Sequence, residues 1–140
     1  MQYVIFNSIL RRHPLEVYVV FSEGGNLFAT TIHVLVSAVL KLSRGARLRE
    51  GMLLYRGLGG LVELPDGFFR ADARGCSGFA EWSFMSTTGD KTVAVLYSGV
   101  KEQRPVPTVL VMATSAVDRG ACICEYSQHP QVAAGPALFL

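Results

Sequence analysis

Arg56 stands at the end of an apolar, strand-like run and directly before a glycine-rich stretch. Residues 52–55 read Met-Leu-Leu-Tyr, and Gly57, Gly59 and Gly60 follow the arginine closely. Glycines leave the backbone open to a ligand, and a guanidinium is a planar fork of N–H donors that fits phosphate oxygens. Taken alone, an arginine at a strand end is more often a solvated surface residue. The pattern therefore makes Arg56 a candidate anion-binding residue that other residues must support.

A second polar cluster ends the strand-like run of residues 81–86. It consists of three consecutive hydroxyl residues, Ser86, Thr87 and Thr88. Side chains alternate along a strand, so Ser86 and Thr88 are expected on one face and Thr87 on the other. Hydroxyls at a strand end commonly serve only as caps. A third segment, residues 118–130, has a strand-like run that leads into a turn.

The order of these three segments resembles the signature of the mono-ADP-ribosyltransferases that modify arginine with NAD, the class with an Arg, a Ser-Thr-Ser and a Glu-x-Glu motif. The resemblance covers residues 28–130. Residues 54–57 match the first motif, and residues 81–88 match the second, with Thr88 in place of a serine. Residues 28–43 are similar to the helix before the first motif. Residues 118–121 and 127–130 resemble the strand and the target-facing turn before the last motif.

The resemblance implies a domain of two packed, mostly antiparallel sheets flanked by helices, with NAD in a cleft between them. NADP is a possible substitute, and no metal is implied. The reaction would transfer ADP-ribose from NAD to arginine side chains of a target protein and release nicotinamide. Its oxocarbenium-like transition state is of the kind that carboxylates stabilise in glycoside hydrolysis. The resemblance assigns catalysis to Arg56 and Ser86, NAD contacts to Tyr55, Arg56, Gly57, Ser86, Thr87 and Thr88, and target contacts to Ser127, Gln128, His129 and Pro130.

The sequence departs from this family at the last motif. Val132 and Ala134 occupy the positions where the resemblance places two glutamates, and residues 132–140 contain no acidic residue. Glu125, the nearest carboxylate, precedes the turn. Two functions remain open: an NAD-dependent arginine ADP-ribosyltransferase, and a catalytically impaired NAD-binding or protein-interaction module. A third interpretation is that the chain is truncated or altered after Pro130.

The elements that must position these residues follow from apolar spacing and from turn residues. Residues 30–43 carry apolar side chains three and four apart, which predicts a helix with one buried face. Residues 90–98 predict a short helix with Asp90 as its N-cap. Strands are predicted at residues 52–55, 81–86, 108–114 and 121–127, and the first 23 residues hold an ambiguous helix and a strand-like run at 17–21. This order predicts an α+β fold and disfavours a doubly wound nucleotide fold.

Composition narrows the class of protein further. Half of the 140 residues are apolar and 10% are aromatic, which indicates one domain, residues 1–140, with a real core. A net charge of +2, with no basic run longer than Arg11-Arg12, lacks the electrostatic footprint of a nucleic-acid binder. The longest uncharged stretch, residues 24–40, is shorter than the roughly 20 apolar residues that span a bilayer. No signal-peptide layout is present at the N-terminus, so a soluble, cytoplasmic protein is expected.

The three cysteines, Cys76, Cys122 and Cys124, are too few and too irregular for a disulfide scaffold, which favours a reducing compartment. On a strand, Cys122 and Cys124 would share one face and could form half of a metal site. No second Cys or His pair stands at zinc-ligand spacing, so buried free cysteines are the favoured interpretation.

Overall fold

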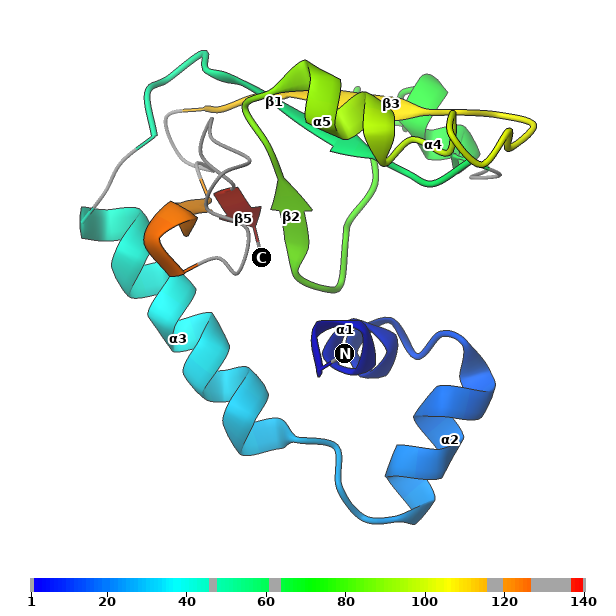
Figure 1. The fold of residues 1–140 in the computed structure, drawn as a ribbon, viewed down its shortest axis with the longest axis vertical. Helices are drawn as coiled ribbons and strands as arrows, with labels where there is room; N and C mark the ends of the chain where they lie inside the picture. Colours follow the sequence, from blue (N-terminus) through cyan, green and yellow to red (C-terminus); the bar gives the residue numbers. More distant parts are fainter. Residues whose placement is uncertain (1, 46–47, 61–63, 116–119, 127–136, 140) are drawn as a thin grey trace.

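The computed structural model describes residues 2–45, 48–60, 64–115, 120–126 and 137–139 (Figure 1). Three helices come first, and short strands and helices alternate after them, which confirms the predicted α+β class. In chain order the elements are α1 (Gln2–Arg11), α2 (Leu15–Glu23), α3 (Ala29–Gly45), β1 (Leu53–Gly57), α4 (Asp66–Phe69), β2 (Met85–Thr87), α5 (Lys91–Leu96), β3 (Val109–Ala113), β4 (Ala121–Cys122), the 3-10 turn η1 (Cys124–Tyr126) and β5 (Ala137–Phe139).

The strands form two small antiparallel sheets. β1 pairs with β3, from Leu53 opposite Ala113 to Gly57 opposite Val109. The second sheet has the order β2-β5-β4, so the C-terminal strand lies between its two neighbours. In Figure 1, β1 and β3 run together with α5 beside them, and β2 runs from near α1 up toward this layer. The helices α2 and α3 flank α1 on either side.

The helix α5 packs on β1 at Gly57. A Cβ atom at this glycine would lie 2.5 Å from the carbonyl carbon of Tyr97 and 2.6 Å from the backbone nitrogen of Ser98. Leu54 on the same strand is fully buried. The predicted cap of α5 is confirmed, because the Asp90 side chain accepts a hydrogen bond of 2.8 Å from the backbone N–H of Thr92. Gly57 therefore has a structural role that its place beside Arg56 did not suggest.

The first three helices meet through aromatic side chains. Phe28, just before α3, lies with its ring centroid 5.5 Å from Phe6 of α1 and 5.5 Å from Phe21 of α2. The predicted helix at residues 30–43 is confirmed, but its apolar face is only partly covered. Val39 is buried, whereas Leu40 is 47% exposed. None of the helices in the described part of the chain is both long and apolar enough to cross a bilayer.

The strand predicted at residues 17–21 is wrong, because this segment belongs to α2. A short apolar run has no periodicity that separates a strand from a helix. The residues that flank the segment indicate a helix. Pro14, which suits a helix start, precedes α2, and Gly25 follows it with a φ of 68°, the left-handed conformation common after helices.

Two other predicted strands are shorter than expected. Of residues 81–86 only 85 and 86 lie in β2, because side chains satisfy the backbone before them: both the N–H and the C=O of Phe84 bond to the amide of Asn7. The strand predicted at residues 121–127 ends at Cys122. The N–H of Tyr126 then bonds the carbonyl of Ile123 at 3.0 Å and closes a 3-10 turn.

We predict that Gly57→Ala lowers the free energy of unfolding by about 1–3 kcal/mol, because the added methyl group meets backbone atoms that can move only if α5 shifts off β1. Chemical denaturation measures the change. Gly45→Ala is the matched control, because nothing lies within 4 Å of a Cβ atom there. Equal stabilities of the two variants would contradict the close packing of α5 on β1.

Candidate functional site

The structure brings Arg56 of β1 and Ser86 of β2 together. Nη1 of Arg56 donates a hydrogen bond of 2.9 Å to the backbone carbonyl of Ser86 and lies 3.4 Å from its Oγ. Both residues are half-buried. The two segments singled out for chemistry, 30 residues apart in the chain, therefore form one cluster.

A backbone pairing between the two sheets causes this contact. The N–H of Tyr55 donates to the carbonyl of Thr88 at 2.7 Å, and the N–H of Thr88 donates to the carbonyl of Tyr55 at 2.9 Å. The Thr88 hydroxyl accepts a bond of 3.1 Å from the N–H of Asp90, the residue that caps α5. Tyr55 and Thr88, both predicted NAD contacts, thus use their backbones to hold Arg56 beside Ser86, and the Thr88 hydroxyl forms the turn into α5.

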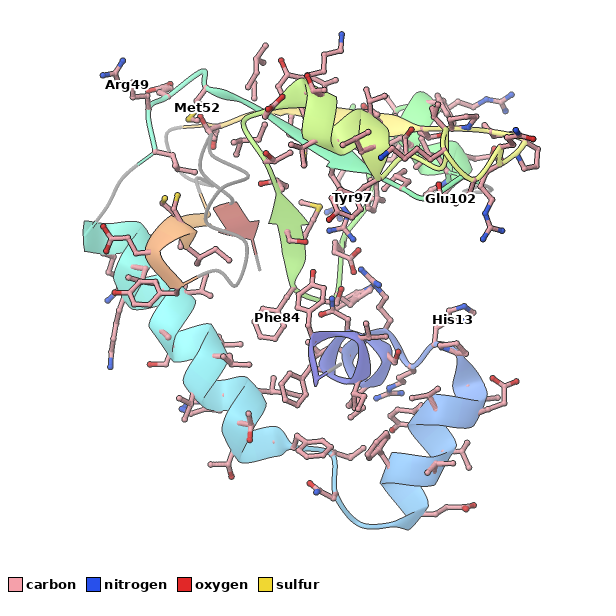
Figure 2. All side chains as sticks on the ribbon, in the orientation of Figure 1. His13, Arg49, Met52, Phe84, Tyr97 and Glu102 are labelled. Atoms are coloured by element: carbon pink, nitrogen blue, oxygen red, sulfur yellow. The ribbon has the colours of Figure 1, made fainter. Side chains whose placement is uncertain are left out.

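One face of α1 supplies three further residues, Tyr3, Asn7 and Arg11. They are four apart and so lie above one another on the helix. Tyr3 Oη donates to the Phe84 carbonyl at 2.7 Å, accepts from the Ser86 N–H at 3.3 Å and lies 3.2 Å from Ser86 Oγ. The Asn7 amide makes two bonds of 3.1 Å with the backbone of Phe84. Figure 2 labels Phe84 at the place where the segment before β2 meets α1.

Arg11 extends this contact to Glu81. Its Nε and Nη2 donate to Oε1 and Oε2 of Glu81 at 3.0 and 2.9 Å, the two-pronged geometry that guanidinium and carboxylate favour. The N–H and Oγ of Ser83 also bond Oε1, at 3.0 and 2.7 Å. Burial raises the pKa of Glu81, but these hydrogen bonds from Arg11 and Ser83 outweigh it, and the net pKa lies below the ordinary value. Glu81 is therefore a fixed, ionised carboxylate.

The phenol of Tyr3 is also perturbed. Burial raises its pKa, but hydrogen bonding with Ser86 and Asn7 and the nearby Arg56 guanidinium lower it, and the net pKa lies below the ordinary value. A lowered phenol pKa reflects stabilisation of negative charge. The hydrogen bonds with Ser86 and Asn7 and the charge of Arg56 thus stabilise the ionised form of the Tyr3 phenol itself.

A pocket of about 310 Å³ lies beside this cluster. Arg11, Arg56 and Glu81 supply its charged groups, for a formal sum of +1. The rest of the lining is apolar: Leu58, Leu64, Pro65, Phe79, Met85 and Leu110. Pockets of this size and character bind small molecules, with a few polar groups fixing the orientation of the ligand. The pocket of this protein thus combines one excess positive charge with a mostly apolar wall.

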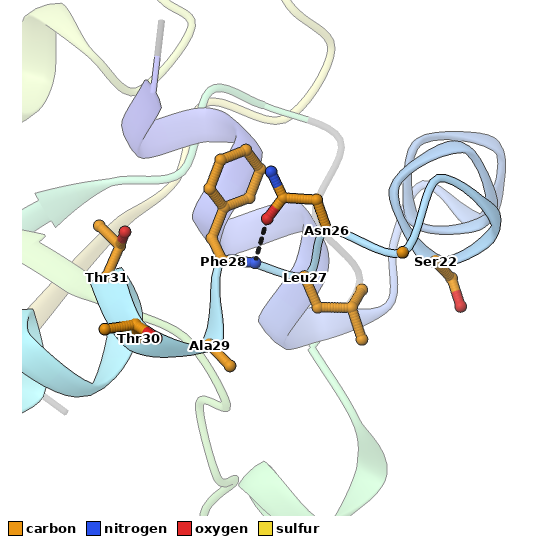
Figure 3. A pocket seen from close by; sticks show the side chains of 8 residues that line it. Ser22, Asn26, Leu27, Phe28, Ala29, Thr30 and Thr31 are labelled. Carbon is orange, nitrogen blue, oxygen red and sulfur yellow. Dashed lines mark hydrogen bonds between the residues drawn. The ribbon is translucent and has the colours of Figure 1, made fainter.

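A second hollow, of about 510 Å³, lies where α2 connects to α3 (Figure 3). The residues that line it are Ser22, Gly25, Asn26, Leu27, Phe28, Ala29, Thr30 and Thr31. The Asn26 side chain accepts a hydrogen bond of 3.1 Å from the N–H of Phe28 and so stabilises the turn. No ionisable side chain lines this hollow, so its lining offers no base to activate the hydroxyls of Ser22, Thr30 and Thr31.

Several predicted residues lie outside the described part of the chain. They are Ser127, Gln128, His129 and Pro130 of the predicted target-facing turn, and Val132 and Ala134 at the expected glutamate positions. Glu125 lies in the turn η1 and is exposed. The strand β5 that follows them pairs with β2, where Leu138 lies opposite Ser86 and Ala137 opposite Thr87. The C-terminal segment therefore joins the sheet that carries Ser86.

Four residues of this cluster were not predicted as site residues from the sequence: Tyr3, Asn7, Arg11 and Glu81. The spacing of the first three was a usable signal, because polar residues four apart mark one face of a helix. Their partner segment could not be identified from spacing. Within the described residues, no three His, Cys, Asp or Glu side chains are grouped as metal ligands.

Comparison of this protein with family models, curated proteins and solved structures finds no match.

We predict that Glu81→Gln lowers stability at neutral pH and that the difference from the unaltered chain disappears in acid. A carboxyl with a depressed folded-state pKa stabilises the fold above its unfolded pKa of about 4.3, and this stabilisation is lost as the pH falls through the lower folded-state value. Urea unfolding between pH 7 and pH 2 measures the effect. Glu102→Gln changes an exposed carboxylate outside the Arg11–Glu81 ion pair, so it is the control and should show no such trend.

Proposed function

We propose that this chain binds NAD in the pocket beside Arg56 and Ser86, in the manner of the arginine-modifying ADP-ribosyltransferases that its motifs resemble. The observation that carries the proposal is the contact between the Arg56 guanidinium and Ser86, 2.9 Å from nitrogen to carbonyl oxygen, at the wall of a small pocket. The two motifs were singled out separately, and each has a bland explanation by itself. The Tyr55–Thr88 pairing brings them together at one pocket, as a shared ligand would require.

The charges of the pocket support an anionic, nucleotide-like ligand. A guanidinium has five N–H donors, so a contact of Nη1 with Ser86 leaves others for phosphate oxygens. Within the described residues, Arg56 forms no ion pair with a carboxylate, whereas Arg11 is paired with Glu81. The apolar side of the pocket, which includes Phe79 and Met85, suits the flat ring of a nicotinamide or an adenine.

The reaction class at this site is transfer of ADP-ribose to an arginine side chain of a target protein. The bond between nicotinamide and ribose breaks with its electron pair on nicotinamide, a guanidinium nitrogen of the acceptor forms the new bond to ribose, and that nitrogen loses a proton. Positive charge develops on the ribose meanwhile, and a facing carboxylate stabilises it. NADP differs from NAD by one phosphate on the adenosine side, away from this bond.

Carboxylates decide whether this chain catalyses that reaction. The positions expected for them hold Val132 and Ala134. Glu81 lines the pocket, but both its oxygens are already bonded by Arg11, whose charge offsets its own. Loss of one charge-stabilising group costs several kcal/mol of barrier, or about 10²–10³ in rate. We therefore propose that the chain as it stands is an NAD-binding module with transferase activity near background.

We predict that Arg56→Ala lowers the affinity for NAD by about 10- to 100-fold, because a charged hydrogen bond to phosphate is worth about 1.5–3 kcal/mol. Arg56→Lys should recover only part of the affinity, since an ammonium cannot replace the planar fork. Titration calorimetry measures both. Arg49→Ala removes an exposed cation at the far end of the molecule in Figure 2 and should leave the affinity unchanged. Equal NAD affinities of all four proteins would remove Arg56 from the site.

We further predict that Ala134→Glu gives the chain slow hydrolysis of NAD, and that Val132→Glu added to it shifts the product toward ADP-ribosylated agmatine. Water needs no second carboxylate to orient it, whereas an incoming guanidinium does. Only two residues of the sequence separate Ala134 from Ala137, which pairs with Thr87 beside Ser86. Nicotinamide release and the mass of the agmatine product measure the two steps.

Ala134→Gln is the matched control, because it has the size of glutamate without the charge. Robust transfer by the unaltered chain would show that another acid serves, and Glu81→Gln would then identify or exclude the one that lines the pocket. No gain from the double change, with NAD still bound, would contradict the assignment of these two positions.

A further inference from the structure

Cys122 and Cys124 bring their sulfur atoms within 2.7 Å of each other. Cys122 is the last residue of β4 and Cys124 is the first residue of η1, so the chain turns between them at Ile123. Both side chains are half-buried rather than enclosed. Two thiols at this separation, with access to solvent, form a potential reaction site.

The two cysteines do not lie on one continuous strand, because β4 ends at Cys122. On a continuous strand, two residues advance roughly 6.6 Å, near the upper limit of the roughly 4.4–6.8 Å between Cα atoms that a disulfide bridges. The predicted strand at residues 121–127 would have placed the two cysteines side by side on one face. The observed turn instead directs their sulfurs at each other.

The pKa of Cys124 is consistent with direct contact between the two thiols. A hydrogen bond with Cys122 is the largest cause of the raised pKa of the Cys124 thiol, followed by burial. A metal is a weaker explanation, since within the described residues these two thiols have no third ligand grouped with them. Two ligands fall short of the four that zinc takes in structural sites.

We propose that Cys122 and Cys124 are a redox site, which a small-molecule disulfide of the glutathione type oxidises to an intramolecular disulfide. One cysteine thiolate attacks the small disulfide, forms a mixed disulfide and expels one thiolate. The second cysteine then attacks the protein sulfur of that mixed disulfide and expels the other. The protein loses two protons and two electrons, and the small disulfide becomes two thiols.

The position of the pair connects it to the rest of the fold. Cys122 lies opposite Ala137 of β5, and β5 lies opposite Ser86 in β2. A disulfide fixes the junction of β4 and η1 at the edge of this three-stranded sheet. The inference stands on the cysteine geometry alone and holds whether or not the chain binds NAD.

The experiment incubates the full chain in buffers of reduced and oxidised glutathione, quenches with acid, alkylates free thiols and digests with trypsin. Residues 120–140 contain no lysine or arginine, so one peptide carries both cysteines, and Cys76 lies in the separate peptide of residues 75–91. Mass spectrometry should find the first peptide lighter by two hydrogens and unalkylated. Cys76, which is exposed, is the internal control and should carry either the alkyl group or a glutathione.

A parallel incubation in urea separates the effect of the fold from nearness in sequence. The folded chain should favour the disulfide at least about tenfold more than the denatured chain, equivalent to about 30 mV. Cys124→Ser should leave a single glutathione or alkyl group on Cys122. Separate modification of the two cysteines at the rate of Cys76, or equal disulfide formation in the folded and denatured chains, would overturn the proposal.

Discussion

The candidate site depends on one short backbone pairing, the two hydrogen bonds between Tyr55 and Thr88. β1 and β2 belong to different sheets, and this bridge holds their ends together. In antiparallel register it places Arg56 opposite Thr87 and next to Ser86. Thr88 also forms the turn that starts α5, and α5 packs back on β1 at Gly57. Backbone contacts therefore fix the residues on both sides of Arg56, Tyr55 and Gly57. The Arg56 side chain thus starts from a fixed backbone, unlike a side chain on an open loop.

The helix α1 completes this arrangement by serving in place of a strand. Phe84 is 2% exposed, so its N–H and C=O need partners, and a buried polar group without one costs roughly 1–3 kcal/mol. The Asn7 amide presents one donor and one acceptor, as a neighbouring strand would. One turn before Asn7, Tyr3 contacts Ser86, and one turn after it, Arg11 contacts Glu81. The same helix face thus orders the segment before β2 and forms part of the pocket.

Local signals in the sequence account for what could be predicted. The helix α3 has regular apolar spacing, and α5 has an aspartate at its cap, so both were identified without knowledge of their partners. The runs at residues 81–84 and 123–126 have the composition of strands, but Asn7 and a 3-10 turn take up their backbone groups. The amide of Asn7 is 77 residues away in the chain, and the 3-10 turn depends on a backbone hydrogen bond, so the composition of either run indicates neither contact. Arg56 and Ser86 were found through a motif, whereas α1 belongs to no part of that motif.

The balance of charge in the pocket favours binding over catalysis. A transition state with positive charge on ribose needs a carboxylate whose charge is not already offset, and Glu81 is held by the guanidinium of Arg11. Arg56, by contrast, contacts the neutral Ser86, so its charge is available to an anion. Phosphate groups of a dinucleotide can use that charge in the ground state as well as in the transition state, and an interaction of equal strength in both raises affinity without raising the rate. Under the proposed function, such a pocket would bind NAD, and a carboxylate added beside Ser86 would be needed for transfer of ADP-ribose.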